Sequence, residues 1–287
     1  HDGSPSDAKA KNYYVTYPDD SDDAEDIIQR IHYARSDHKG HHKPNELIHL
    51  RKEALEEARR FKEVAHRIEE AILDNSLELN FQPIYSFEKN RITSLEVLSR
   101  LKDGKHNYIN PEYFIHVAEI NHTIIQLSRQ MFEKTCRFAV DNNIFDRGIN
   151  DMNINISPIQ CQDKHLVQDL KKIAAKYGIP FERFHFEITE SRLTDEKAVR
   201  ETLTKLKENG AKIALDDFGT GYSNIASIML MPIDFVKIDK SLLWSYASGD
   251  NEFLNELMPM IRGEGKKIIA EGIETEEHIE ILRRMGG

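Results

Sequence analysis

The chain has 287 residues, of which 39% are hydrophobic and 31% charged, and its formal net charge is -10. This composition excludes a largely disordered protein, and the length suits one large α/β domain with a smaller segment attached. The acidic balance argues against a nucleic-acid polymer as a partner, because binding to a phosphate backbone depends on clustered Lys and Arg.

The N-terminal part divides into two segments. Residues 1–44 are polar, rich in Asp, Ser, His and Lys, and contain one short amphipathic helical stretch at 24–31. They are too few for an independent hydrophobic core. Residues 45–74 carry apolar side chains at helical spacing, among them Leu50, Phe61 and Ile68, and this pattern predicts a linker helix.

From residue 75 onward, short apolar runs alternate with longer helical patterns, which is typical of βα units around a parallel sheet. Strands are predicted at residues 79–85, 93–98, 152–156, 184–188, 212–216, 235–238 and 267–270. Helices are predicted between them, among others at 123–142, 165–177, 196–209, 252–263 and 276–285. A closed barrel of this class has eight strands. We therefore expect a TIM-type (β/α)8 barrel over residues 75–287, with its eighth strand not present in this sequence.

Polar side chains recur at alternate positions of these strands, so they share the face that a barrel turns inward. Asn153 and Asn155 share one face of their strand, as do His185 and Glu187. Further polar side chains lie at or just beyond the ends of later strands: Asp216, Asp217, Lys237, Asp239 and Glu271. This arrangement predicts a polar site at one end of the sheet.

Several ionised carboxylates in a partly dry pocket repel one another and lose hydration, so bound cations are the simplest way to neutralise them. Oxygen ligands suit Mg²⁺ or Mn²⁺. Such a set can hold two ions, the arrangement that cleaves phosphodiesters, with a lysine beside the attacking water. The alternative is that single carboxylates form helix caps or salt bridges, and that Lys237 is a structural ion-pair partner of Asp239 or Asp216.

Seven segments resemble the EAL family of phosphodiesterases, which hydrolyse cyclic di-GMP. They occur in the family's order: Phe81-Gln82-Pro83-Ile84, Leu95-Glu96-Val97-Leu98-Ser99-Arg100, Asn155-Ile156-Ser157-Pro158, Glu187-Ile188-Thr189-Glu190-Ser191, Asp216-Asp217-Phe218-Gly219-Thr220-Gly221-Tyr222-Ser223, Val236-Lys237-Ile238-Asp239 and Ala270-Glu271-Gly272-Ile273-Glu274-Thr275. The motif that names the family reads Glu96-Val97-Leu98 here, with Val in place of Ala at a position that binds no metal. The number and order of these segments make the resemblance specific.

The resemblance implies a site with two divalent cations, Mg²⁺ or Mn²⁺. Its implied metal ligands are Glu96, Asn155, Glu187, Asp216, Asp217 and Glu271. Catalytic roles fall on Lys237, which activates the water, and on Asp217 and Glu96. Gln82 and Arg100 would contact the dinucleotide. Glu190 would steady the loop after Asp217, although capping the helix after Ser191 would also explain it.

The implied activity is metal-dependent hydrolysis of one phosphodiester bond of cyclic di-GMP to the linear dinucleotide, in bacterial second-messenger signalling. The alternative is a catalytically silent receptor that binds cyclic di-GMP and signals by a change of conformation or assembly. The family's last strand carries a Gln-Gly-Tyr-like segment that this sequence does not contain. The resemblance also implies a homodimer formed through the barrel.

Residues 13–34 resemble the last strand and helix of a GGDEF domain, so we interpret 1–44 as the C-terminal remnant of such a domain and expect an upstream regulatory or cyclase-like domain in the full protein. Cys136 and Cys161 have no partner at metal-binding spacing. The sequence contains no apolar run of roughly 18 residues, the length needed to span a membrane. We expect a cytoplasmic protein, or the cytoplasmic part of a membrane-anchored one. Trp244 is expected to pack in the core or against a helix, or to stack on a base at the pocket rim.

Overall fold

The computed structural model describes residues 12–28, 47–49, 52–105, 107–189, 196–219 and 231–285. The chain divides into two compact units, residues 1–67 and 68–287. The strands that carry the predicted site all belong to the second unit. The histidine cluster at 38–42 lies outside the described residues.

In the first unit, β1 (Asn12–Tyr14) pairs in parallel with β2 (Leu47–His49). The rings of Tyr14 and His49 stack with centroids 4.5 Å apart. Residues 24–28 are helical, inside the stretch predicted at 24–31. The strand at 47–49 corrects the prediction of a helix from about residue 45: these residues pair with β1, and helix α2 (Lys52–Leu73) begins only at Lys52.

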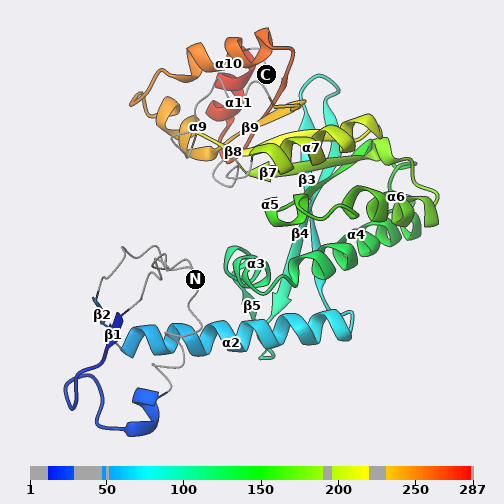
Figure 1. Ribbon diagram of the computed structural model, residues 1–287. Helices are drawn as coiled ribbons and strands as arrows, with labels where there is room; N and C mark the ends of the chain where they lie inside the picture. Colours follow the sequence, from blue (N-terminus) through cyan, green and yellow to red (C-terminus); the bar gives the residue numbers. More distant parts are fainter. Residues whose placement is uncertain are drawn as a thin grey trace, which may run out of the picture. The chain divides into compact units, whose positions relative to one another are not determined.

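In the part of the second unit that the structure describes, the strands form one eight-stranded sheet in the order β10-β9-β8-β7-β6-β4-β3, with the short β5 on β4 (Figure 1). The strands are β3 (Glu78–Ser86), β4 (Arg91–Lys102), β5 (Tyr108–Ile109), β6 (Asp151–Asn155), β7 (Phe184–Thr189), β8 (Lys212–Phe218), β9 (Phe235–Ile238) and β10 (Lys267–Ala270). All seven predicted strands are present. The sheet is curved and open, and within the described part of the chain β3 and β10 form its two edges.

The first two strands differ from the predicted βα pattern. β3 runs antiparallel to β4, with Glu78 opposite Arg100 and Ser86 opposite Arg91. Only the turn at residues 87–90 joins them. A parallel pair would need a crossover of about a dozen residues or more, so this short link permits only a hairpin. The sheet is therefore mixed rather than uniformly parallel.

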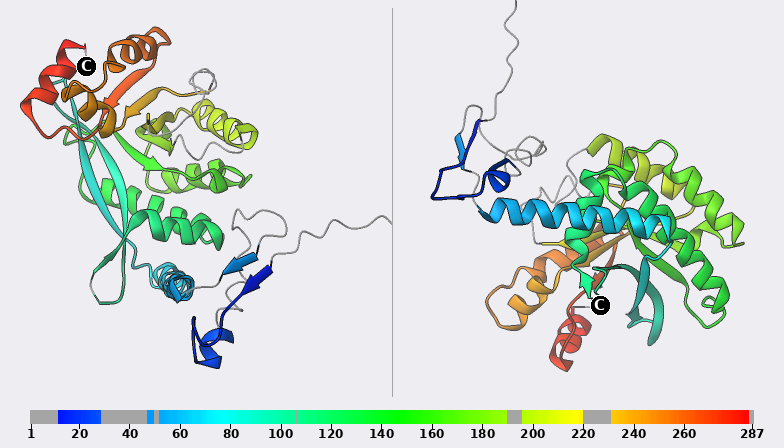
Figure 2. Two further views of the ribbon diagram at one scale, coloured as in Figure 1. Left: turned by 90° about the vertical axis from the view of Figure 1, so that its left-hand side faces the viewer. Right: turned by 90° about the horizontal axis from the view of Figure 1, so that it is seen from below.

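Within the described residues, the helices of the second unit are α3 (Pro111–Ile120), α4 (Ile124–Asp141), α5 (Pro158–Cys161), α6 (Leu166–Lys176), α7 (Glu196–Glu208), α9 (Lys240–Ala247), α10 (Leu254–Gly263) and α11 (Glu276–Arg284). Helices α3, α4, α7 and α10 contact strands of the sheet. Helices α4, α6 and α7 lie side by side, and α9 contacts both α10 and α11 (Figure 2). No described helix is long and apolar enough to cross a bilayer.

Aromatic side chains form the contact between α4 and the sheet. Phe132 of α4 lies with its ring centroid 4.7 Å from that of Phe184 on β7. Phe132, Phe184 and Phe186 are all fully buried. Each such side chain contributes about 1.5–3 kcal/mol through the apolar surface removed from water, so this layer fixes α4 against the centre of the sheet.

Side-chain caps begin three of the helices that follow site strands. Ser157 and Gln160 form a capping box at α5, directly after β6. Asp239 accepts a hydrogen bond from the Ser241 N–H at the start of α9, and Thr275 accepts one from His278 at the start of α11. Each such cap stabilises its helix by about 1 kcal/mol. The chain therefore turns from strand to helix within a few residues of each strand end.

Candidate metal centre

The strand register places the predicted polar residues on one face of the sheet. Glu96 lies opposite Asn153, Asn155 opposite Glu187, and Thr189 opposite Asp216. Because side chains two residues apart on a strand share a face, these pairings keep the polar positions on the same side of β4, β6, β7 and β8.

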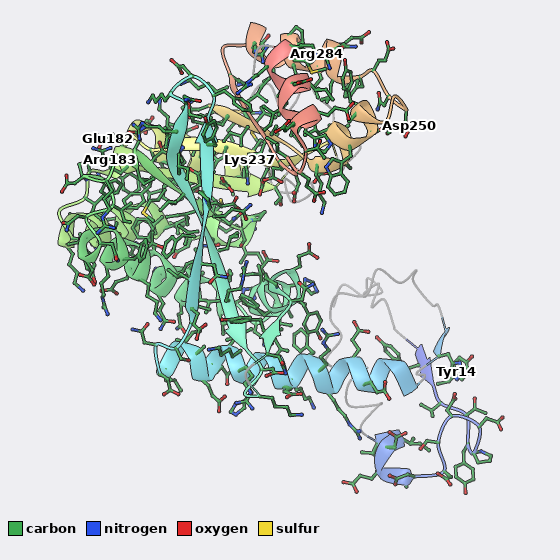
Figure 3. All side chains as sticks on the ribbon, turned by 180° about the vertical axis from the view of Figure 1, so that it is seen from behind. Tyr14, Glu182, Arg183, Lys237, Asp250 and Arg284 are labelled. Carbon is green, nitrogen blue, oxygen red and sulfur yellow. The ribbon has the colours of Figure 1, made fainter. Side chains whose placement is uncertain are left out.

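Lys237 lies at the centre of this group, among the strands of the sheet (Figure 3). Its Nζ is within ion-pair distance of four carboxylates: 2.8 Å from Asp216, 2.9 Å from Glu187, 2.9 Å from Glu271 and 3.3 Å from Glu96. The Lys237 residue is 1% exposed. Of the two structural partners considered for Lys237, Asp216 is one, while Asp239 caps α9.

Burial and charge together determine the ionisation of this cluster. Burial lowers the pKa of Lys237, but the surrounding carboxylates outweigh it and raise the pKa above the usual range of a lysine. Burial raises the pKa of Glu187 to about 8, with Glu96 and Asp216 adding to the effect and Lys237 opposing it. Burial also raises the pKa of Glu271. One ammonium does not balance four carboxylates, and the cluster keeps an excess of negative charge.

An irregularity in β8 brings two consecutive acids to the site. The pairing of β8 with β9 shifts register between Leu215 and Phe218, and Asp217 has a left-handed φ of 54°. In a regular strand, Asp216 and Asp217 would point to opposite faces. With the irregularity, both carboxylates join the acidic cluster, and burial followed by repulsion from Asp216 raises the pKa of Asp217.

The acidic side chains form two groups that share Asp216. One consists of Glu96, Glu187 and Asp216, the other of Asp216, Asp217 and Glu271, and in each group the ligand atoms lie within 4.8 Å of one another. Carboxylate oxygens are the ligands of hard cations such as Mg²⁺ and Mn²⁺. In addition, Glu187 Oε1 is buried without a hydrogen-bond partner, which is costly unless a cation meets it. These residues fit a pair of divalent cations that share one carboxylate.

Asn155 lies beside the first of these groups. Its Nδ2 donates a 3.5 Å hydrogen bond to Glu96 Oε1, so the amide nitrogen faces the acids. To serve as a ligand, the amide would have to turn and present its oxygen.

The two residues predicted to contact substrate lie on the β3–β4 hairpin. Gln82 is exposed and pairs with Glu96 across the hairpin. Arg100 lies on the same face of β4 as Glu96, is partly buried, and donates through Nη1 to the Ser99 carbonyl at 2.9 Å. Glu190 lies outside the described residues.

Trp244 makes a contact next to the site that the sequence did not predict. Trp244 of α9 donates through Nε1 to the Gly272 carbonyl at 2.8 Å, across 28 positions of the chain. Gly272 directly follows Glu271. The sequence-based interpretation of Trp244 as a packing or base-stacking residue did not include this hydrogen bond, because neither periodicity nor motif spacing indicates a contact between distant segments.

Residues 65–287 match the EAL domain family. The chain belongs to this family. The match covers every strand of the second unit, and it includes all the residues of the candidate metal centre.

Two curated proteins from Pseudomonas aeruginosa are similar to the chain. The cyclic di-GMP phosphodiesterase NbdA is 26% identical over 270 residues, covering 93% of the chain and 34% of NbdA. The bifunctional diguanylate cyclase/cyclic di-GMP phosphodiesterase MucR is 29% identical over 229 residues, covering 78% of the chain and 33% of MucR. The chain thus spans about a third of the length of these relatives.

Solved EAL structures confirm the predicted fold class. The PaMucR phosphodiesterase, in complex with c-di-GMP, superimposes with a TM-score of 0.69 at 28% identity, over 78% of the chain and 92% of PaMucR. The EAL enzyme Bd1971, in its form with cAMP and cyclic-di-GMP bound, gives a TM-score of 0.72 at 26% identity, over 82% of the chain and 65% of Bd1971. The chain therefore has the mixed α/β EAL fold with a curved, open sheet.

Proposed function

We propose that this EAL domain hydrolyses one phosphodiester bond of cyclic di-GMP, giving the linear dinucleotide, with two divalent cations, Mg²⁺ or Mn²⁺. The observation that carries the proposal is the pair of acidic groups joined at Asp216 around the buried Lys237. The similarity to relatives named as cyclic di-GMP phosphodiesterases supports the choice of substrate.

The ligand assignment follows the two groups. Glu96, Glu187 and Asp216 would hold one cation, with Asn155 adding its amide oxygen, and Asp216, Asp217 and Glu271 would hold the other. Bound there, the cations would supply positive charge to the phosphate and lower the pKa of the attacking water. Asp216 belongs to both groups, so it would help to hold both cations.

Lys237 would orient the attacking water, and Asp217 would accept its proton. In the cation-free cluster the surrounding carboxylates raise the pKa of Lys237, so its side chain is a hydrogen-bond donor. It would orient the water and offset the negative charge that develops on the phosphate. Proton acceptance would then fall to a carboxylate, and Asp217, whose pKa burial raises, is the acceptor that we assign.

Gln82 and Arg100 would bind the dinucleotide, since both lie on the hairpin that carries Glu96. A guanidinium suits this role, because its planar donors can meet phosphate or base oxygens in pairs. Glu190 would steady the loop that follows Asp217.

A turnover assay tests the proposal. Incubation with cyclic di-GMP and Mg²⁺ or Mn²⁺ should give linear dinucleotide, resolved by chromatography, and a chelator should stop the reaction. Glu96→Gln keeps the side-chain size but removes a ligand charge, so we expect turnover to fall by more than about 100-fold. Glu88→Gln, at an exposed position in the β3–β4 turn, is the matched control and should leave the rate unchanged.

Binding of cyclic di-GMP by the wild-type chain without any turnover would contradict the enzyme proposal and favour the silent receptor. Turnover at the wild-type rate in Glu96→Gln would instead remove Glu96 from the ligand set.

The proposal extends to the whole protein. Residues 1–44 would be the end of a GGDEF-like domain, and an upstream regulatory or cyclase-like domain would control a homodimer formed through the barrel. The greater length of NbdA and MucR, and the bifunctional name of MucR, support this arrangement.

A further inference from the structure

Trp244, the only tryptophan in the chain, connects α9 to the loop after β10. Its Nε1–H donates to the carbonyl oxygen of Gly272 at 2.8 Å. Gly272 follows Glu271, whose Oε1 lies 2.9 Å from Lys237 Nζ. The indole therefore contacts the backbone one residue away from a candidate metal ligand.

Glu271 has the most exposed side chain of the four carboxylates that contact Lys237. Its side chain is 30% exposed, compared with 13% for Glu96, 11% for Asp216 and 0% for Glu187. The Glu271 N–H donates to the Ile238 carbonyl at 3.0 Å. Restraint on the other side of the loop comes from α9.

The contact between the loop and α9 is close and needs glycine. Gly272 has a φ of 66°, and a Cβ at this position would collide with Cβ of Lys240 and lie 3.2 Å from Trp244 Nε1. Lys240 Nζ lies 5.4 Å from the centroid of the Trp244 ring, one helical turn away on α9, where residues four apart are neighbours. The position of the indole is therefore restrained from two sides.

These contacts close into a ring. The backbone leads from Lys237 through the capping residue Asp239 into α9, the Trp244 indole reaches the Gly272 carbonyl, and the Glu271 carboxylate returns to Lys237 Nζ. A displacement of the loop would break the last of these contacts.

We propose that Trp244 is a positioning residue of the metal centre, whose indole N–H holds the Gly272 carbonyl and thereby keeps the Glu271 carboxylate turned toward Lys237, Asp216 and Asp217. The part of this inference that concerns cations rests on the proposed function. The part that concerns the loop does not.

Hydrogen exchange on the chelator-treated full chain tests the loop directly. Trp244→Phe keeps an aromatic ring but deletes the N–H, and loss of one hydrogen bond corresponds to roughly fivefold faster exchange at the amide of Glu271, which bonds the Ile238 carbonyl. Tyr246→Phe is the matched control, because it deletes a donor on the same helix that bonds Asn255 at 3.0 Å. It should leave the Glu271 amide unchanged. Equal protection in Trp244→Phe and wild type would overturn the proposal.

Calorimetric titration with Mg²⁺ tests the consequence for the metal centre. Trp244→Phe should weaken binding by about tenfold, the size of effect seen when groups that orient metal ligands are removed, while Tyr246→Phe should bind like wild type. Wild-type affinity in Trp244→Phe would overturn the positioning role. Failure of the wild-type chain itself to bind Mg²⁺ would contradict the proposed function, and the exchange result would still decide the role of Trp244.

Discussion

Lys237 shares one positive charge among four carboxylates, and this imbalance governs the chemistry of the site. Removing one partner of a buried ion pair costs about 3–5 kcal/mol, so loss of the ammonium would destabilise the fold as well as the site. Glu187 is fully buried, and burial raises its pKa to about 8 even though Lys237 Nζ lies 2.9 Å away. Either a proton or a bound cation can neutralise the Glu187 carboxylate.

Competition between the proton and the cation makes Mg²⁺ binding depend on pH. Because the pKa of Glu187 is raised to about 8, a proton must leave before the carboxylate can bind the ion at lower pH. We expect the Mg²⁺ affinity measured by calorimetry to rise with pH up to about 8, by at most about tenfold per pH unit. Glu187→Gln should bind more weakly and lose this dependence, whereas a flat profile in the wild-type chain would contradict the prediction.

The raised pKa of Glu187 also determines how the stability of the cation-free protein, measured in chelator, changes with pH. The folded pKa of Glu187 of about 8 lies above the unfolded value of about 4.3. Glu187 therefore contributes stability that is complete below about pH 4.3 and is lost as pH rises through about 8.

At the level of elements, the irregular stretch of β8 carries two ligands where a regular strand would carry one. The left-handed φ of Asp217, 54°, is unfavourable for most residues and least so for Gly, Asn and Asp. The backbone at this point therefore restricts the side chain independently of its charge.

Two substitutions separate backbone strain from charge. Asp217→Asn and Asp217→Val both remove the carboxylate, but Asn tolerates the left-handed region while a β-branched residue does not. In urea unfolding with chelator present, we expect Asp217→Val to be less stable than Asp217→Asn by about 1–2 kcal/mol. Both variants should lose turnover. Equal stability of the two would show that the backbone relaxes at this position.

The sequence predicted the strands well because apolar runs encode burial, and burial does not depend on strand direction. The βα prediction was wrong at the start of the sheet, where the first two strands are antiparallel. The link at residues 87–90 is so short that it permits only a hairpin. Side-chain parity placed Glu187 and Lys237 on the polar face, but it puts Asp216 and Asp217 on opposite faces. Their position at the strand end and the resemblance both predicted the two acids at the site, but no local pattern shows the register shift after Leu215 that brings them together.

The contact of Trp244 shows a second limit of the sequence. Propensity and periodicity describe neighbours within an element, whereas this hydrogen bond joins α9 to a loop 28 residues away. The sequence shows that residue 272 is glycine, but it does not show why. A larger residue would collide with Lys240, and this depends on how the two segments pack.

At the scale of the whole second unit, both cysteines lie inside the helical layer around the sheet. Cys136 of α4 is 0% exposed and Cys161 of α5 is 4% exposed. Burial raises the pKa of each thiol to about 12. Because the thiolate is the reactive form, neither thiol can react at a neutral pH without an opening of this layer.

Thiol labelling should therefore report global unfolding. With an aromatic disulfide reagent at about pH 8, we expect neither cysteine to react in the folded chain and both to react in denaturant. Under native conditions the labelling rate should increase with urea in step with unfolding followed by circular dichroism. Rapid labelling of one cysteine without urea would show that its helix opens locally.

The two acidic groups that meet at Asp216 are anchored unequally. Glu96 lies within the 12-residue strand β4, flanked by β3 and β6, and Glu187 lies on β7 between β6 and β8. Asp217, in contrast, belongs to an irregular stretch of β8, and Glu271 follows β10 with a side chain that is 30% exposed. Under the proposed two-cation chemistry, the cation held by Asp217 and Glu271 should therefore bind more weakly than the cation held by Glu96 and Glu187. Turnover would then follow the occupancy of the weaker site as Mg²⁺ is titrated.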